Sequence, residues 1–155
     1  MDNINVSKQY LQFREKVVNY TNDDMNLKLE NDNQVYIAIF DIPSESGIVG
    51  NETQTYALVF GLNAHIYLSS GYAFTNLEKN VNVMRAMQTL LVNAHQVLGK
   101  MQLVHSANYY YSKNIRAYLK TGQGIFFKEL LGDCKEDRFL LMLLNNLRKE
   151  ISSVM

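Results

Sequence analysis

Apolar residues follow two different periods along this chain, and together these periods limit the folds that it can adopt. Between residues 62 and 68 apolar and polar side chains alternate, which is typical of a strand with one buried and one wetter face. From Val83 to Met101 apolar side chains recur every three or four positions, which is typical of a helix with a broad apolar face. We therefore expect helices and a sheet in one mixed fold.

Three segments carry helix signals. Ser7 is a candidate N-cap for a first helix that extends to about residue 19. The sequence Thr75-Asn76-Leu77-Glu78 fits a capping box and predicts the start of the central helix. Gly99 either ends this helix or is an interior glycine of a helix that extends to Met101. Asp133 is a candidate N-cap for the last helix, which carries leucines at helical spacing.

The predicted strands lie between these helices. Residues 34–42 are rich in β-branched and aromatic side chains, and Pro43 is expected to end this strand. Residues 44–52 are expected to form a mobile loop. Residues 53–68 read as strand again, with Gly61 marking either a bulge in one strand or a hairpin turn.

The segment of residues 103–131 fits two interpretations. We favour short antiparallel strands over residues 103–104, 115–119 and 125–127. Alternatively, residues 112–121 form a short helix that ends at Gly122. The sequence alone leaves both interpretations open.

The predicted fold is α+β, in one domain over residues 1–155: an antiparallel sheet of about five strands with three helices, in the order α-β-β-(β)-α-β-β-α. This order of elements is similar to that of small secretion chaperones and of Roadblock-type and longin-type adaptors. The resemblance lies in the order of elements and implies a protein that binds other proteins.

Composition narrows the protein class. The chain has 155 residues, of which 47% are hydrophobic, so one ordinary core can form and disorder of the whole chain is excluded. The longest apolar runs span about six residues, whereas a membrane helix needs about twenty, so no membrane partner is predicted. The first residues are polar and acidic, which predicts no secretory signal and a cytoplasmic location.

No pattern of catalytic or metal-ligating residues stands out. His65, His95 and His105 do not have the spacing of metal ligands, and the single cysteine, Cys134, excludes a cysteine-based zinc site. Cys134 at the start of a helix, together with a histidine, could act as a nucleophile only if the fold brought them together. We therefore predict no catalytic residue, no metal and no cofactor, and we retain a small enzyme or ligand-binding domain as an alternative.

A basic and aromatic stretch suggests a second alternative. Residues 100–128 contain five basic side chains interleaved with tyrosines, a pattern suited to single-stranded nucleic acid. The net charge of the whole chain is zero, however, and the nucleic-acid-binding domains that this pattern resembles are strongly basic. Nucleic-acid binding is therefore the less favoured interpretation.

The leading prediction is a non-catalytic protein–protein interaction domain that forms a homodimer or binds another protein, as a small adaptor, a chaperone-like protein or an immunity-type protein. The run Phe139-Leu140-Leu141-Met142-Leu143-Leu144 is apolar on all sides of the last helix, so Leu141 and Met142 are predicted to face a partner. Tyr109 and Tyr111 are further candidate contacts, because tyrosine is common at interfaces. Charge is also asymmetric: nine acids and four bases lie in residues 1–60, and six acids and eleven bases in residues 61–155.

Overall fold

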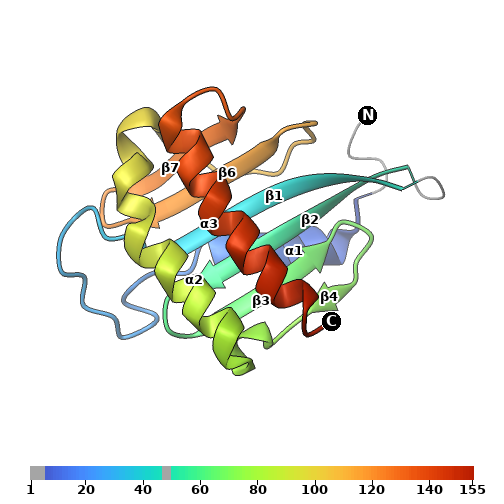
Figure 1. Cartoon of the computed structure of the whole chain (residues 1–155), viewed down its shortest axis with the longest axis horizontal. Helices are drawn as coiled ribbons and strands as arrows, with labels where there is room; N and C mark the ends of the chain where they lie inside the picture. The colour runs from blue at the N-terminus through green and yellow to red at the C-terminus, as the bar shows by residue number, and fades with distance from the viewer. Residues whose placement is uncertain (1–5, 47–49) are drawn as a thin grey trace.

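The centre of the molecule is an antiparallel sheet of seven strands in the order β4-β3-β2-β1-β6-β7-β5 (Figure 1). The computed structural model describes residues 6–46 and 50–155. The strands are β1 (Ile37–Ser46), β2 (Gly50–Val59), β3 (Asn63–Leu68), β4 (Ala73–Phe74), β5 (Gln102–Val104), β6 (Ile115–Thr121) and β7 (Gly124–Leu130).

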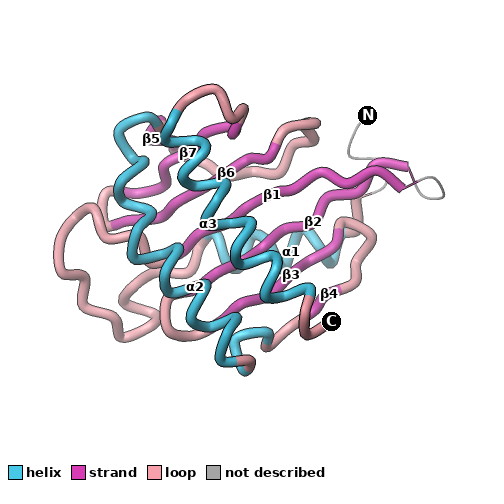
Figure 2. Tube along the Cα trace, viewed as in Figure 1, coloured by secondary structure: helices cyan, strands magenta, loops and turns pink. Residues whose placement is uncertain are grey.

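Helices cover both faces of the sheet unequally. Helix α2 (Val81–Asn93) continues into the 3-10 helix η2 (Ala94–Lys100) and packs beside α3 (Lys135–Ser152) on one face. Helix α1 (Lys8–Val18) packs on the opposite face, behind the sheet in Figures 1 and 2, and is the only α-helix there within residues 6–46 and 50–155. The two faces of the sheet therefore meet different helical layers.

Alternation along β1 divides the interior between these layers. Phe40 and Ile42 belong to the larger apolar core beneath α2 and α3, whereas Ile37 and Ile39 belong to a smaller cluster on the other face. The helices complete the larger core with their apolar stripes: Val83, Met87, Leu90 and Leu91 on α2, and Leu140, Leu144, Leu147 and Ile151 on α3. This central strand is covered on both faces, as its continuous apolar run predicts.

The predicted α+β class, the three α-helices and the antiparallel sheet are confirmed, but the sheet has seven strands where about five were expected. The edge strands β4 and β5 have two and three residues, too few to show a clear alternation in sequence. Of the two interpretations of residues 112–121, the strand is correct, because β6 pairs with β1 and β7. Gly61 lies in a hairpin turn between β2 and β3, with a φ of 70°.

Two boundary predictions near Pro43 were wrong. Pro43 lies inside β1, paired with Thr53, and does not end the strand. Strand β6 pairs with β1 only as far as Asp41, so from Pro43 onward one edge of β1 is open and a missing N–H is tolerated. The loop predicted over residues 44–52 is instead strand at both ends, and residues 47–49 lie outside the described residues.

Of the predicted helix starts, only that of α1 is confirmed. The Ser7 hydroxyl accepts the N–H of Gln9 and of Tyr10. The cap of α2 is Asn80, not Thr75: the Asn80 side chain accepts the N–H of two residues in the first turn. Glu78 instead accepts the N–H of Ala64 at 2.9 Å, so a contact between distant parts of the chain replaces the capping box.

The start of α3 and the expected wetter face of β3 also need correction. The N-cap of α3 is Cys134, one residue after the predicted Asp133. On β3 the expected alternation holds from residue 63 to residue 66, but on the wetter face Tyr67 is buried and stacks on Phe13 of α1 with ring centroids 5.1 Å apart. Across residues 6–46 and 50–155, no helix is both long enough and apolar enough to cross a membrane.

Candidate functional site

A row of polar side chains crosses the sheet on the face that α1 covers. Strand register aligns Thr55 with Asp41, Asp41 with Arg116, and Arg116 with Glu129, on β2, β1, β6 and β7. Laterally paired residues of an antiparallel sheet point to the same face, so these four side chains form neighbouring positions. They are far apart in sequence, and only the strand order brings them together.

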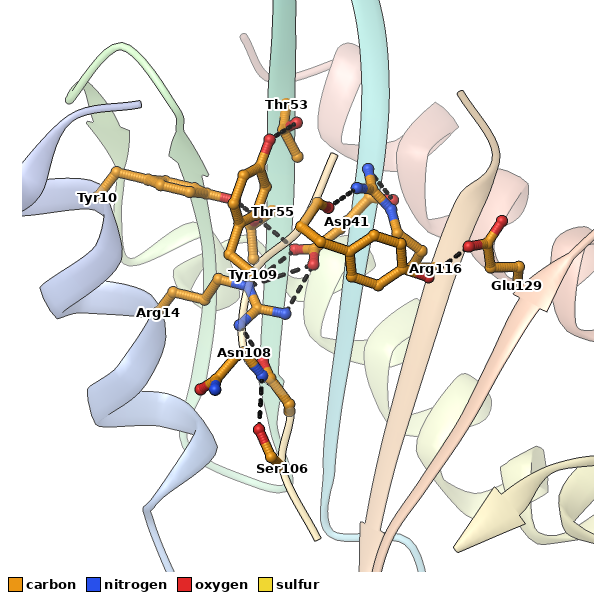
Figure 3. A network of polar contacts seen from close by, with 12 residues as sticks. Tyr10, Arg14, Asp41, Thr53, Thr55, Ser106, Asn108, Tyr109, Arg116 and Glu129 are labelled. Carbon is orange, nitrogen blue, oxygen red and sulfur yellow. Dashed lines mark hydrogen bonds and ion pairs between the residues drawn. The ribbon is translucent and has the colours of Figure 1, made fainter. Parts of the chain in front are cut away.

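A buried ion pair joins this row to α1 (Figure 3). Arg14 donates from Nη2 to Asp41 Oδ2 at 2.7 Å and from Nε to both carboxylate oxygens at 3.2 Å. Only 3% of Arg14 and 0% of Asp41 is exposed. Thr55 donates to Asp41 Oδ1 at 2.6 Å, and because that uses its only hydrogen, Tyr10 donates its hydroxyl to Thr55 at 2.5 Å.

The ion pair fixes the charge state of this centre. Burial disfavours the Arg14 cation, but the adjacent Asp41 carboxylate outweighs burial and holds the pKa of Arg14 above its ordinary value. Burial, reinforced by the negative charge of Asp41, raises the pKa of Tyr10 far above its ordinary value. Burial and Asp41 likewise raise the pKa of Tyr118 to about 12. The tyrosines therefore stay protonated and cannot act as bases at neutral pH.

A second buried arginine, Arg116, lies on the other side of Asp41 (Figure 3). Its guanidinium carbon is 5.9, 5.6 and 5.9 Å from the ring centroids of Tyr109, Tyr110 and Tyr111. Its Nη1 donates to the carbonyl of Tyr110, and within the described residues its Nε has no hydrogen-bond partner. The three consecutive tyrosines thus surround an arginine of their own chain.

The segment of residues 105–114, which we call the strap, is fastened to the sheet by this network. Arg14 donates from Nη1 to the carbonyl of Ala107, and Arg116 holds the carbonyl of Tyr110. Tyr109 shares a hydrogen bond of 2.9 Å with Thr53. Two buried arginines therefore hold an irregular segment over a sheet face on which only one α-helix packs.

Glu129 anchors the outer end of the strap. It accepts hydrogen bonds from the hydroxyl of Tyr110, from Ser112 at 2.9 Å and from Asn114 at 3.0 Å. Burial opposes ionisation of Glu129, but these hydrogen bonds outweigh it and hold the pKa of Glu129 below its ordinary value. Glu129 is therefore an ionised structural anchor.

A cleft of about 470 Å³ opens between α1 and the strap. Its volume falls in the usual range of ligand pockets, about 300–1,000 Å³. Arg14 lies at the cleft, but most of its donors are already used by Asp41 and Ala107. The other lining residues are Leu11, Glu15, Val18, Asn19, His105, Ser106, Ala107, Asn108, Tyr109 and Ile125.

The predicted partner-binding residues fall on two separate faces. Tyr109 and Tyr111 lie together in the strap, where both rings pack against Arg116. Leu141 and Met142 lie on α3 across the sheet. Met142 is 48% exposed, whereas Leu141 is partly buried and packs against the larger core.

The three histidines lie on different elements, and among the described residues no hydrogen bond joins any of them to Cys134. His65 is on β3 and His105 follows β5, near opposite sides of the sheet, while His95 is on η2 in the two-helix layer. The Asp133, Cys134 and Asp137 ligand atoms lie within 4.8 Å of one another. However, Asp137 Oδ2 already accepts from Lys128 at 2.9 Å and from the N–H of Leu131 and Gly132, so this cluster closes the turn before α3.

No known protein family matches the chain, and neither does any curated protein or solved structure. The chemistry of this centre must therefore be judged from its own geometry. One sequence signal pointed to it: Asp41 interrupts the apolar run of residues 35–42. A lone acid inside a buried strand needs a partner, but sequence alone did not identify Arg14.

Proposed function

We propose that this protein is a non-catalytic domain that binds another protein. Its densest polar centre is used internally: Arg14, Arg116 and Asp41 hold α1 and the strap to the sheet. Arg14 and Asp41 neutralise each other and Arg116 is enclosed by tyrosine rings, whereas a catalytic group must reach a substrate. This arrangement favours a structural role for the centre and a binding role for the surface.

The observation that carries the proposal is the edge of the sheet at β4. Tyr72 is 74% exposed and Phe74 is 41% exposed, next to a strand that pairs only with β3 among the described residues. Edge strands of monomers often carry charged side chains that prevent pairing with other chains, but residues 69–77 contain none. An uncharged edge with two exposed aromatic rings suits contact with another protein.

A photo-crosslinking residue at position 72, introduced in the native cell, tests this proposal. We expect one discrete protein adduct, and we expect Phe74→Ser to reduce its yield several-fold. The same probe at exposed Thr89, on α2, is the control and should give no such adduct. Equal adducts at both positions, or none at position 72, would contradict binding at the β4 edge.

Self-association is a second form of the proposal, supported by the 48% exposure of Met142 on α3. Light scattering at micromolar concentration measures it directly. A strict monomer would contradict the homodimer. A dimer that Met142→Glu leaves intact, but Tyr72→Ser weakens, would place the contact at the β4 edge.

Binding of single-stranded nucleic acid is a weaker candidate. The sequence-based argument for nucleic-acid binding required tyrosines that could stack on bases. In the structure, the rings of Tyr109, Tyr110 and Tyr111 pack around Arg116. A mobility shift with a single-stranded oligonucleotide at low salt, lost at high salt, would favour it over protein binding.

A further inference from the structure

The cleft between α1 and the strap has a feature that an ordinary surface depression lacks: one of its walls is a segment with free main-chain groups. Within residues 6–46 and 50–155, no backbone–backbone hydrogen bond reaches residues 106–111. The N–H of Asn108 bonds the Ser106 hydroxyl at 3.2 Å, and the carbonyl of Ala107 is held by Arg14. Other main-chain groups of this wall lack an internal backbone partner.

Extended peptides are often recognised through main-chain groups that lack a partner within the protein, as along an exposed sheet edge. A peptide that lies along such a segment adds a strand-like pairing, in which main-chain hydrogen bonds give affinity and side-chain contacts give specificity. The strap is well suited to this role because Arg14 and Arg116 hold two of its carbonyls from beneath. A prearranged wall reduces the entropy lost on binding.

The side chains of the cleft define the chemistry of the occupant. Arg14 is paired with Asp41, and exposed Glu15 is the acidic side chain of the lining. Leu11, 39% exposed, lies with Val18 and Ile125 along the same cleft and offers apolar contact. The complementary ligand carries a positive charge near Glu15 and apolar side chains beside it.

We infer that the cleft between α1 and the strap binds an extended, basic peptide segment of a partner protein. Its main chain bonds groups of residues 106–109 that no other described residue holds, such as the N–H and carbonyl of Tyr109, and a lysine or arginine of the segment faces Glu15. This site goes beyond the proposed function, because it uses a different surface from the β4 edge. An experiment can therefore disprove binding at one of these two sites without disproving binding at the other.

Fluorescence anisotropy with labelled hexapeptides and the whole protein tests this site. The probe alternates lysine and valine; one comparison peptide replaces lysine with glutamate, and another carries N-methyl groups on alternate amides. We expect the lysine peptide to bind at least tenfold more tightly than either comparison. Equal binding of the N-methylated peptide would overturn main-chain pairing, and no binding at millimolar concentration would overturn the site.

A matched pair of charge reversals locates the contact. Glu15→Lys should weaken binding of the lysine peptide at least tenfold. Glu150→Lys, on α3 in the groove between α2 and α3, makes the same change in net charge and should leave binding unchanged. Equal losses in both variants would show nonspecific charge attraction and overturn the site. Tyr72→Ser should leave peptide binding intact, which separates this inference from the proposed β4 contact.

Discussion

The two faces of the sheet are both buried under helices, but different kinds of contact hold each face. Beneath α2 and α3, Phe40 and Leu144 are fully buried among hydrocarbon side chains. Beneath α1, the adjacent residue of β1 is Asp41, equally buried but paired with Arg14. The helical layer with two long helices relies on apolar area, whereas the layer with one short helix combines smaller apolar clusters with charge pairing and hydrogen bonds.

This difference has an energetic consequence. Apolar burial tolerates small rearrangements, because the remaining atoms can partly close a cavity. A buried ion pair does not tolerate the loss of one side chain, because the remaining partner stays charged and desolvated. The α1 face should therefore be more specific in its geometry and more fragile towards loss of a single side chain.

The largest expected effect follows from breaking the ion pair. Arg14→Ala should lower the free energy of unfolding by about 3–5 kcal/mol, because Asp41 is left buried without its cation. Urea denaturation measures the loss. The double variant Arg14→Met with Asp41→Leu should recover part of it, since neither member of the ion pair is then buried without the other, while the buried Arg116 stays charged. A loss of under about 1 kcal/mol in the single variant would mean that water reaches Asp41.

The matching change on the other face is Leu144→Ala. It should cost about 2–5 kcal/mol through lost burial and a residual cavity. Hydrogen exchange should separate the two variants: Arg14→Ala should speed exchange mainly in α1 and the strap, and Leu144→Ala throughout α2, α3 and the sheet. Identical exchange patterns would contradict the division of the interior into two differently held faces.

A smaller effect tests the start of α2 in the two-helix layer. Asn80→Ala should cost about 1 kcal/mol, because the Asn80 side chain accepts two N–H groups of the first turn. Thr75→Ala is the matched control and should change the free energy of unfolding by less than about 0.5 kcal/mol. A larger loss of the free energy of unfolding in Thr75→Ala than in Asn80→Ala would show that Thr75, and not Asn80, caps the helix.

The smallest expected effect is the pH dependence contributed by Glu129 on the α1 face. The pKa of Glu129 is lower in the folded protein than its ordinary value of 4.5, so the unfolded chain binds a proton first. Its contribution to stability is present above pH 4.5 and is lost as the pH falls through the lower, folded pKa. Glu129→Gln should therefore reduce the fall in urea midpoint between pH 7 and pH 3.

Glu30→Gln, in an exposed turn, is the control for the removal of one carboxylate. The difference between the urea midpoints at pH 7 and pH 3 should be close to that of the unchanged protein. A Glu129→Gln variant with an undiminished pH dependence would show that Tyr110, Ser112 and Asn114 do not stabilise the ionised form.

Local signals predicted much of the fold because their causes are local. The Ser7 cap, the helical stripe from Val83 to Met101 and the alternation in residues 115–119 each depend on neighbours a few positions away. Predictions failed where a distant segment competed. Glu78 bonds Ala64 instead of completing a capping box, and Pro43 stays in a strand because β6 ends before reaching it.

The sequence by itself determined the mixed α+β class, the presence and order of the three α-helices and the apolar residues of the central strand, because hydrophobic period and turn chemistry act over short distances. The tertiary structure alone decided that Arg14 meets Asp41, that three tyrosines surround Arg116, and that a cleft opens beside the strap. These contacts depend on strand order and on which face each helix covers. Both are set by long-range pairing, which no window of neighbouring residues contains.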